Sequence, residues 1–275
     1  MVYFETFDTL QEFASTINTR KINSTFKTLE NCLSQKESER RTEKTGTATY
    51  SDADSLLFSG DNENLAKLKR ANVKSMIQSN SYTANMLKAQ KHVCGCLPNI
   101  PLYLIGAPNN MLNFRRKPAK SKVMNLVVNI AVNYKVTTDQ IIEAGSNIAS
   151  IIKELEKNGI RINLYISFFS SCKDDYIGAL INIKKSSAPL NMLNIAYPLI
   201  NPSMLRRHFF RYIETAPAKL DKGYTKNYGR VATFQEMLQK EPKLAKFKNS
   251  VIIDIQEMIG ASVSDMVKTI SDKTK

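Results

Sequence analysis

The chain has 275 residues, of which 43% are hydrophobic and 23% charged, as is typical of a soluble globular protein. No apolar run approaches the ~18 residues that span a bilayer, and the first residues, MVYFETFDTLQEF, carry acids where a secretory signal carries lysines, so we expect neither a membrane span nor a signal peptide. The net charge of +14 indicates either a surface that attracts polyanions or a Lys-rich surface that serves solubility alone.

The N-terminal part, residues 1–92, is predicted to be helical and polar. Apolar residues recur at three- and four-residue steps in FDTLQEFASTIN, residues 7–18, which predicts a helix. Two short helices are expected on either side of Gly60, with Asp61 or Asn62 capping the second.

Residues 93–122 are predicted to be irregular. Pro98, Pro101 and Pro108 exclude the interior of a helix from this stretch. Its last part, FRRKPAKSK, is basic throughout and carries no acid, which indicates a basic linker or crossing segment.

Strands and helices alternate from residue 122 onward. An apolar run is typical of a central strand covered on both faces, and Thr137 with Gln140 forms a capping box for the helix that follows. The next two strands are joined by a polar turn too short for a crossover helix, which predicts an antiparallel hairpin. The expected elements are a strand over 122–132, a helix over 138–159, strands over 160–169 and 176–185, helices over 191–200 and 201–216 with breaks at Pro198 and Pro202, a strand over 250–258 and a helix over 260–273.

This order predicts an α/β fold, a three-layer sandwich whose mostly parallel sheet has an antiparallel hairpin at its edge, as in von Willebrand A-type domains. We expect two parts. A helical and irregular N-terminal region, residues 1–122, packs on a von Willebrand A-like domain, residues 123–275.

Several segments also resemble a known family. They are KTGTATYSDADSLLFSG, LPNIPLYLIGAPNNM, the strand and helix around residues 123–158, and NPSMLRRHFFRYIE followed later by NYGR. In this order they resemble an uncharacterised family of tailed-bacteriophage proteins. The resemblance implies a phage origin, and with it a location in the host cytoplasm or in the virion, and it implies no activity.

The expected domain type holds Mg²⁺ through Asp-x-Ser-x-Ser at the end of its first strand. Hard cations need oxygen ligands, at least one of them charged. The corresponding positions here are Asn129, Ala131 and Asn133, so we expect a degenerate site, no metal and no cofactor.

Catalytic motifs are not evident. A structural zinc site has four ligands, and three candidates lie close together in the sequence, namely His92, Cys94 and Cys96. Because their spacing departs from C-x₂-C, zinc binding and buried thiols both stay open. His208 is expected at the margin of the core, and no nucleophile or phosphate-loop motif is present. Whether the protein is an enzyme is uncertain, and we lean against it.

Basic clusters carry the functional prediction. Tyrosines interleaved with cations suit single-stranded nucleic acid, because rings stack on bases and cations follow phosphates. Arginine also binds carboxylates, so an acidic protein partner fits equally. The candidate nucleic-acid-binding residues are Arg115, Arg116, Lys117, Arg206, Arg207, Arg211, Lys226, Tyr228 and Arg230.

We therefore predict a non-enzymatic phage protein that binds nucleic acid during genome handling or packaging. The alternative is a protein–protein interaction module, either a virion component or an inhibitor of a host factor. No membrane partner is expected, and the oligomeric state stays open.

Overall fold

The computed structural model describes residues 1–24, 26, 32–35, 39–68, 87–116, 122–157, 159–216, 224, 228–261 and 265. A central sheet has the strand order β1-β7-β6-β5-β9, with the short β8 also paired to β6. Its strands are β1 (Val2–Phe7), β5 (Val123–Asn129), β6 (Arg161–Cys172), β7 (Asp175–Lys184), β8 (Arg230–Val231) and β9 (Val251–Asp254). The pairs β1·β7, β5·β6 and β5·β9 are parallel, which confirms an α/β fold with a mostly parallel sheet.

The predicted hairpin is present, but it does not form the edge of the sheet. β6 and β7 are antiparallel, as expected. β1 lies outside β7 and pairs with it in parallel, from Val2 opposite Tyr176 to Phe7 opposite Ile181. The prediction of a hairpin edge is therefore wrong, and the N-terminal region contributes a strand to the sheet as well as helices.

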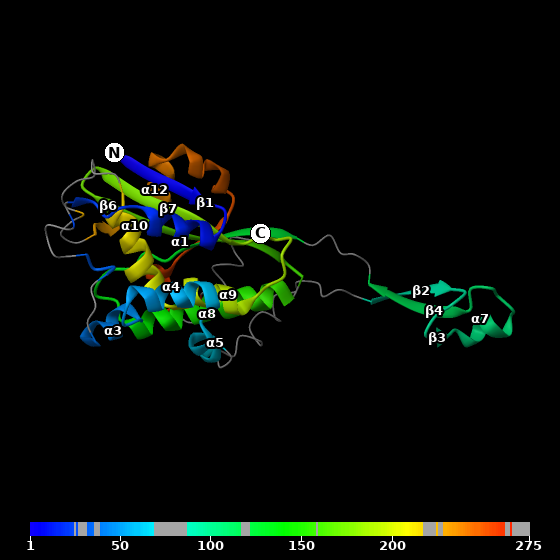
Figure 1. The fold of residues 1–275 in the computed structure, drawn as a ribbon. Coiled ribbons are helices and arrows are strands. Elements are labelled where there is room, and N and C mark those ends of the chain that lie inside the picture. The colour runs from blue at the N-terminus through cyan, green and yellow to red at the C-terminus, as the bar shows by residue number, and fades with distance from the viewer. Residues whose placement is uncertain are drawn as a thin grey trace.

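Helices cover both faces of the sheet (Figure 1). On one face lie α1 (Leu10–Thr19), α4 (Tyr50–Ser59), α8 (Thr138–Lys157), α9 (Met192–Ile200), the π-helix η1 (Met204–Phe209) and α10 (Phe210–Glu214), which share the larger apolar core. On the other face α12 (Phe234–Lys240) and the 3₁₀ helix η2 (Pro242–Phe247) pack over Phe4, Val127 and Phe169. Three further helices of the body lie within the described residues, namely α3 (Glu39–Thr45), α5 (Asn62–Leu68) and α13 (Ile255–Met258).

Local sequence signals set several helix ends. Thr137 and Gln140 form the predicted capping box at the start of α8. Asp61 caps α5 by accepting from the Asn64 amide at 3.0 Å. Pro198 lies inside α9 rather than at a break. The predicted helix over 260–273 falls almost wholly outside the described residues.

A small antiparallel sheet lies apart from this body (Figure 1). Its order is β2-β4-β3, formed by β2 (Leu87–His92), β3 (Leu97–Pro98) and β4 (Met111–Arg116), with the helix α7 (Ile100–Leu104) between β3 and β4. The prediction that residues 93–122 are irregular is wrong, because Pro98 stands in a short strand and Pro101 in the first turn of α7, where the missing amide hydrogen costs little. In the part of the chain that the structure describes, no helix is long and apolar enough to cross a membrane.

Candidate functional site

The arginines of residues 206–211 that we expected to bind nucleic acid, and therefore to be exposed, lie inside the protein. Arg206, Arg207 and Arg211 are 9%, 0% and 8% exposed. Arg207 shows the cause, because its Nη1 donates to the Ser34 carbonyl at 2.8 Å and its Nη2 donates to the carbonyls of residues 47 and 48 at 3.0 and 2.8 Å. The prediction of an exposed face is wrong, since a segment distant in sequence covers this helix and its carbonyls occupy the guanidinium.

Arg206 joins two further segments. Its Nη1 donates to the Lys44 carbonyl at the end of α3, and its Nη2 donates to the Val136 carbonyl just before α8 at 2.7 Å. Burial lowers the pKa of this guanidinium from its ordinary high value. Both arginines come from η1, the one π-helical segment in the described part of the chain. They act as buried connectors between the helices and are not a surface for phosphates.

The tyrosines that we expected to stack on bases are buried too. Tyr224 is 1% and Tyr228 5% exposed, and the Tyr228 ring stacks on Phe210 with centroids 4.3 Å apart. The Tyr228 hydroxyl donates to Glu214 Oε1 at 2.7 Å. Burial raises the pKa of Glu214, while hydrogen bonds from Ser34 and Tyr228 act in the opposite direction. The prediction that Tyr228 offers a free stacking ring is wrong.

The other candidates are distributed differently. Arg230 has an exposed side chain and pairs with Glu236 at 3.3 Å. Arg115 and Arg116 belong to β4 of the small sheet, far from the helices of the body (Figure 1). Lys117 and Lys226 lie outside the described residues. The structure therefore does not gather the nine predicted residues into one site.

The degenerate metal position lies at the carboxyl end of β5. The Asn129 amide group donates to Asp254 Oδ1 at 2.6 Å and to the Ala232 carbonyl at 3.2 Å, and its Oδ1 accepts from the Ala131 amide. Asn133 accepts from the Lys135 amide, closing a local turn. Asn129 thus ties β5 to β9 and to the segment before α12.

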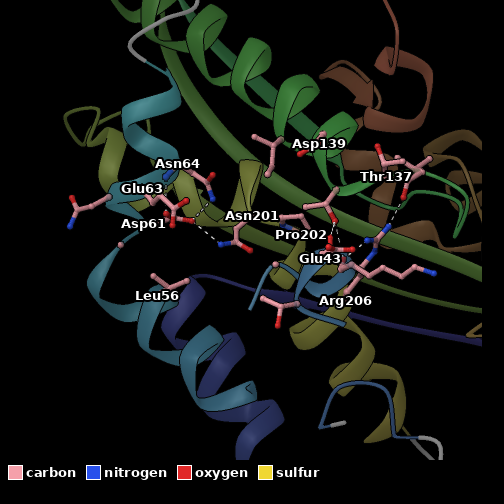
Figure 2. A pocket seen from close by; sticks show the side chains of 18 of the residues that line it. Glu43, Leu56, Asp61, Glu63, Asn64, Thr137, Asp139, Asn201, Pro202 and Arg206 are labelled. Carbon is pink, nitrogen blue, oxygen red and sulfur yellow. Dashed lines mark hydrogen bonds between the residues drawn. The ribbon is translucent and has the colours of Figure 1, made fainter. Parts of the chain in front are cut away.

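A pocket of about 980 Å³ opens beside this junction, between the α4–α5 turn, the start of α8 and the α9–η1 turn (Figure 2). Asp61 Oδ2 accepts from the side-chain amides of Asn64 at 2.7 Å and Asn201 at 2.8 Å. Arg206 is committed to main-chain carbonyls, as described above. Four carboxylates line the pocket, those of Glu43, Asp61, Glu63 and Asp139.

This pocket has the size of a small-molecule site. None of the residues that line it is His or Cys. Across the described ranges of the chain, no three His, Cys, Asp or Glu side chains come close enough together to hold a metal ion. Its central polar groups bond to one another or to the backbone, so they hold α5, α9 and η1 in place.

A second cavity, of about 680 Å³, adjoins the first and shares Lys44, Tyr134 and Arg206 with it. Its lining is mostly apolar and comes from the β5–α8 loop, β6 and η1. The Ser170 hydroxyl at its edge already donates to the Tyr228 carbonyl at 2.7 Å. It therefore offers shape and apolar surface but no activated nucleophile.

The histidines and cysteines form no reactive constellation among the described residues. His208 is fully buried, with Nδ1 2.9 Å from the Tyr197 hydroxyl and Nε2 2.8 Å from Asp54 Oδ1, so it is a core residue held by two partners. In the small sheet, His92 Nδ1 accepts from the Cys94 amide at 3.2 Å, and Cys94 and Cys96 are exposed free thiols. Of the two alternatives left open by the sequence, buried thiols do not fit these two positions.

The small sheet carries an unusual apolar surface. Ten large hydrophobic side chains of the described chain are exposed, and six of them lie between residues 93 and 105. We call these six residues the apolar tip. They are Val93 (61%), Leu97 (51%), Ile100 (64%), Tyr103 (66%), Leu104 (76%) and Ile105 (76%). Exposed apolar side chains gathered within so short a segment are typical of an interaction site.

The ribbon formed by β2 and β4 has two different faces. Lys88 is paired with Arg115, and Gln90 with Asn113. Because residues two apart on a strand share a face, these four positions lie on one face of the ribbon. The opposite face holds Leu87, Ala89, Lys91, Leu112, Phe114 and Arg116. One face is therefore polar and basic in sequence, and the other is largely apolar.

The excess charge of the protein is concentrated in the part of the sequence that contains this sheet. Residues 64–138, which we call the acid-free stretch, contain 12 Lys and Arg and no Asp or Glu, whereas the rest of the chain holds 27 and 25. Sequence reasoning found only one part of this stretch, residues 115–122. A charge count over a longer window would have found all of it, but only the structure shows that its middle forms a separate small sheet.

The fold and these surfaces define a class, namely an α/β domain that carries a separate small sheet within an acid-free stretch. The chain belongs to a family of domains of unknown function, DUF7192, whose family model matches residues 1–270. No curated protein and no solved structure matches the chain.

Proposed function

We propose that this protein binds nucleic acid through the small sheet β2-β4-β3 and the cations of the acid-free stretch around it. The observation that carries the proposal is the charge distribution, since 12 cations without an acid occupy residues 64–138 while the remainder of the chain is nearly balanced. Cations that neutralise phosphates supply most of the affinity for nucleic acid by releasing counterions. The buried Arg206, Arg207 and Arg211 have no part in this proposal.

The test compares matched charge variants in a binding titration with a fluorescent duplex. The variant of the small sheet, which we call the arm variant, changes Lys88, Lys91, Arg115 and Arg116 to Gln. The control changes four lysines of the body that are exposed, Lys153, Lys157, Lys243 and Lys248, to Gln. Both variants lose the same net charge, so a general electrostatic effect weakens them equally. The proposal requires a much larger loss of affinity for the duplex in the arm variant than in the control, and equal losses of affinity would contradict it.

A protein-binding role is the second candidate, and the apolar tip favours it. Exposed aliphatic side chains such as Leu104 and Ile105 are also what a protein partner buries at the centre of an interface. In this alternative the protein is a virion component or an inhibitor of a host factor, and its cations face an acidic partner. Capture that survives nuclease treatment and high salt would favour this role over nucleic-acid binding.

We also propose a phage origin and a von Willebrand A-like scaffold. The origin is supported by the resemblance of the motifs to tailed-bacteriophage proteins. Genome handling or packaging, within the host or the virion, is the role that we propose for nucleic-acid binding in such a protein. The scaffold is supported by the order β7-β6-β5-β9 with β7 antiparallel, and by Asn129 standing where the metal motif begins. The additional strand β1 departs from that pattern.

A further inference from the structure

We infer that the apolar tip inserts between base steps of duplex DNA as a wedge and kinks it. This inference rests on the proposed function and specifies how the small sheet contacts duplex DNA. Proteins that bend DNA from the minor groove combine cations and amides that contact the groove with Leu, Ile or Pro side chains that unstack a base step.

In the small sheet, the apolar residues and the cations likewise occupy separate segments. No Lys, Arg, Asp or Glu lies between His92 and Phe114, so the end of the small sheet is uncharged. The cations stand behind it, with Lys88 and Arg115 paired four residues before the end of the ribbon. At about 3.3 Å per residue this separation is roughly 13 Å, which is about twice the width of the minor groove. Cations at these two positions of the ribbon can therefore contact the phosphates that border the groove while the apolar tip enters it.

The kind of apolar residue favours duplex over single-stranded nucleic acid. Binding to single strands uses aromatic rings as stacking platforms. Tyr103 is the one exposed aromatic ring of the apolar tip, and its neighbours Leu104 and Ile105, both 76% exposed, are aliphatic. Aliphatic side chains stack poorly on free bases but suit a wedge between paired ones.

The polar residues of the same region favour nucleic acid over a lipid surface. Four asparagines, Asn99, Asn109, Asn110 and Asn113, lie among the apolar residues of this uncharged segment. Side-chain amides are costly to place in hydrocarbon. In the minor groove they find acceptors and donors on the base edges.

The test measures bending and binding separately. A duplex with a dye at each end reports the bend by energy transfer, a 2-aminopurine in its centre reports unstacking, and anisotropy reports affinity. The tip variant changes Leu104 and Ile105 to Ser, which leaves the core intact because both side chains are exposed. The control changes Phe58, 58% exposed on α4 in the body, to Ser.

We expect the wild type and the Phe58→Ser variant to bend the duplex by roughly 20–90° and to raise 2-aminopurine fluorescence. The tip variant should keep its affinity within about tenfold, because the phosphate contacts remain, and should lose both signals. Wild-type binding without bending, or equal bending by the tip variant, would overturn the wedge and leave nucleic-acid binding in place. Absence of duplex binding would overturn both proposals, as would tip-dependent binding to anionic phosphatidylserine vesicles without binding to DNA.

Discussion

The two faces of the β2–β4 ribbon should differ in their contribution to DNA binding. Changing Lys88 and Arg115 to Gln removes two cations from the face that also holds Gln90 and Asn113. Changing Lys91 and Arg116 to Gln removes two from the opposite face. We expect the first pair to weaken binding much more, since amides beside the cations can contact sugars and base edges once the phosphates fix the ribbon in place.

The magnitude follows from counterion release. The logarithm of the binding constant falls with the logarithm of salt concentration by about 0.9 per phosphate contact, so loss of two contacts flattens this dependence by about 1.8. Between about 50 and about 200 mM salt, the affinity of the wild type should therefore fall about tenfold more than that of the Lys88→Gln/Arg115→Gln variant. Fluorescence anisotropy at four salt concentrations measures both slopes. Unchanged slopes, or equal changes for the two pairs, would refute the assignment of the binding face.

Three further predictions concern the body of the protein. Arg207→Met leaves the buried carbonyls of Ser34 and Thr47 and the more exposed carbonyl of Ala48 without their donor, and it should lower the free energy of unfolding by about 3–5 kcal/mol in a urea titration. In Gly145→Ala the new Cβ would lie 2.2 Å from the Leu199 carbonyl oxygen, so α8 and α9 must separate, and we expect a loss of about 1–3 kcal/mol by the same measurement. Burial alone would raise the pKa of Glu5, but the hydrogen bonds from Arg20, Tyr3 and Tyr212 and the positive charge of Arg20 together outweigh burial and lower this pKa. The Glu5–Arg20 pair therefore stabilises the fold above the ordinary Glu pKa, and this contribution is lost as the pH falls through the lowered value. Glu5→Gln should therefore cost about 1 kcal/mol at neutral pH and nothing at low pH, and a constant difference from pH 7 to pH 3 would contradict this explanation.

Local signals in the sequence predicted much of the body. The apolar steps of residues 7–18 gave α1, the pair Thr137 and Gln140 gave the start of α8, and the short turn after β6 gave the hairpin. These features depend on residues that are close in the chain. β1 was missed although Val2–Phe7 is rich in β-branched and aromatic residues. Its partner strand β7 begins only at Asp175, and no residue near the N-terminus indicates this pairing.

The candidate site was the least predictable part for the same reason. The spacing of Arg207 and Arg211 sets their directions on a helix, but burial depends on which distant segment covers that helix. Here the carbonyls of residues 34, 47 and 48 lie more than 150 positions away in sequence. In the small sheet, prolines suggested irregular structure, while the pairing of β2 with β4 depends on residues 19 or more positions apart. Exposure of Leu104 and Ile105 could be seen only once that pairing was known.

The central claim is that nucleic acid contacts the small sheet, and hydrogen–deuterium exchange tests it most directly. The full chain is exchanged with and without a saturating DNA duplex, and peptides are compared along the sequence. The account predicts slower exchange in peptides covering Leu87–His92 and Met111–Arg116, with little change in η1 and α10. Protection confined to the helices of the body, with none in the small sheet, would contradict it.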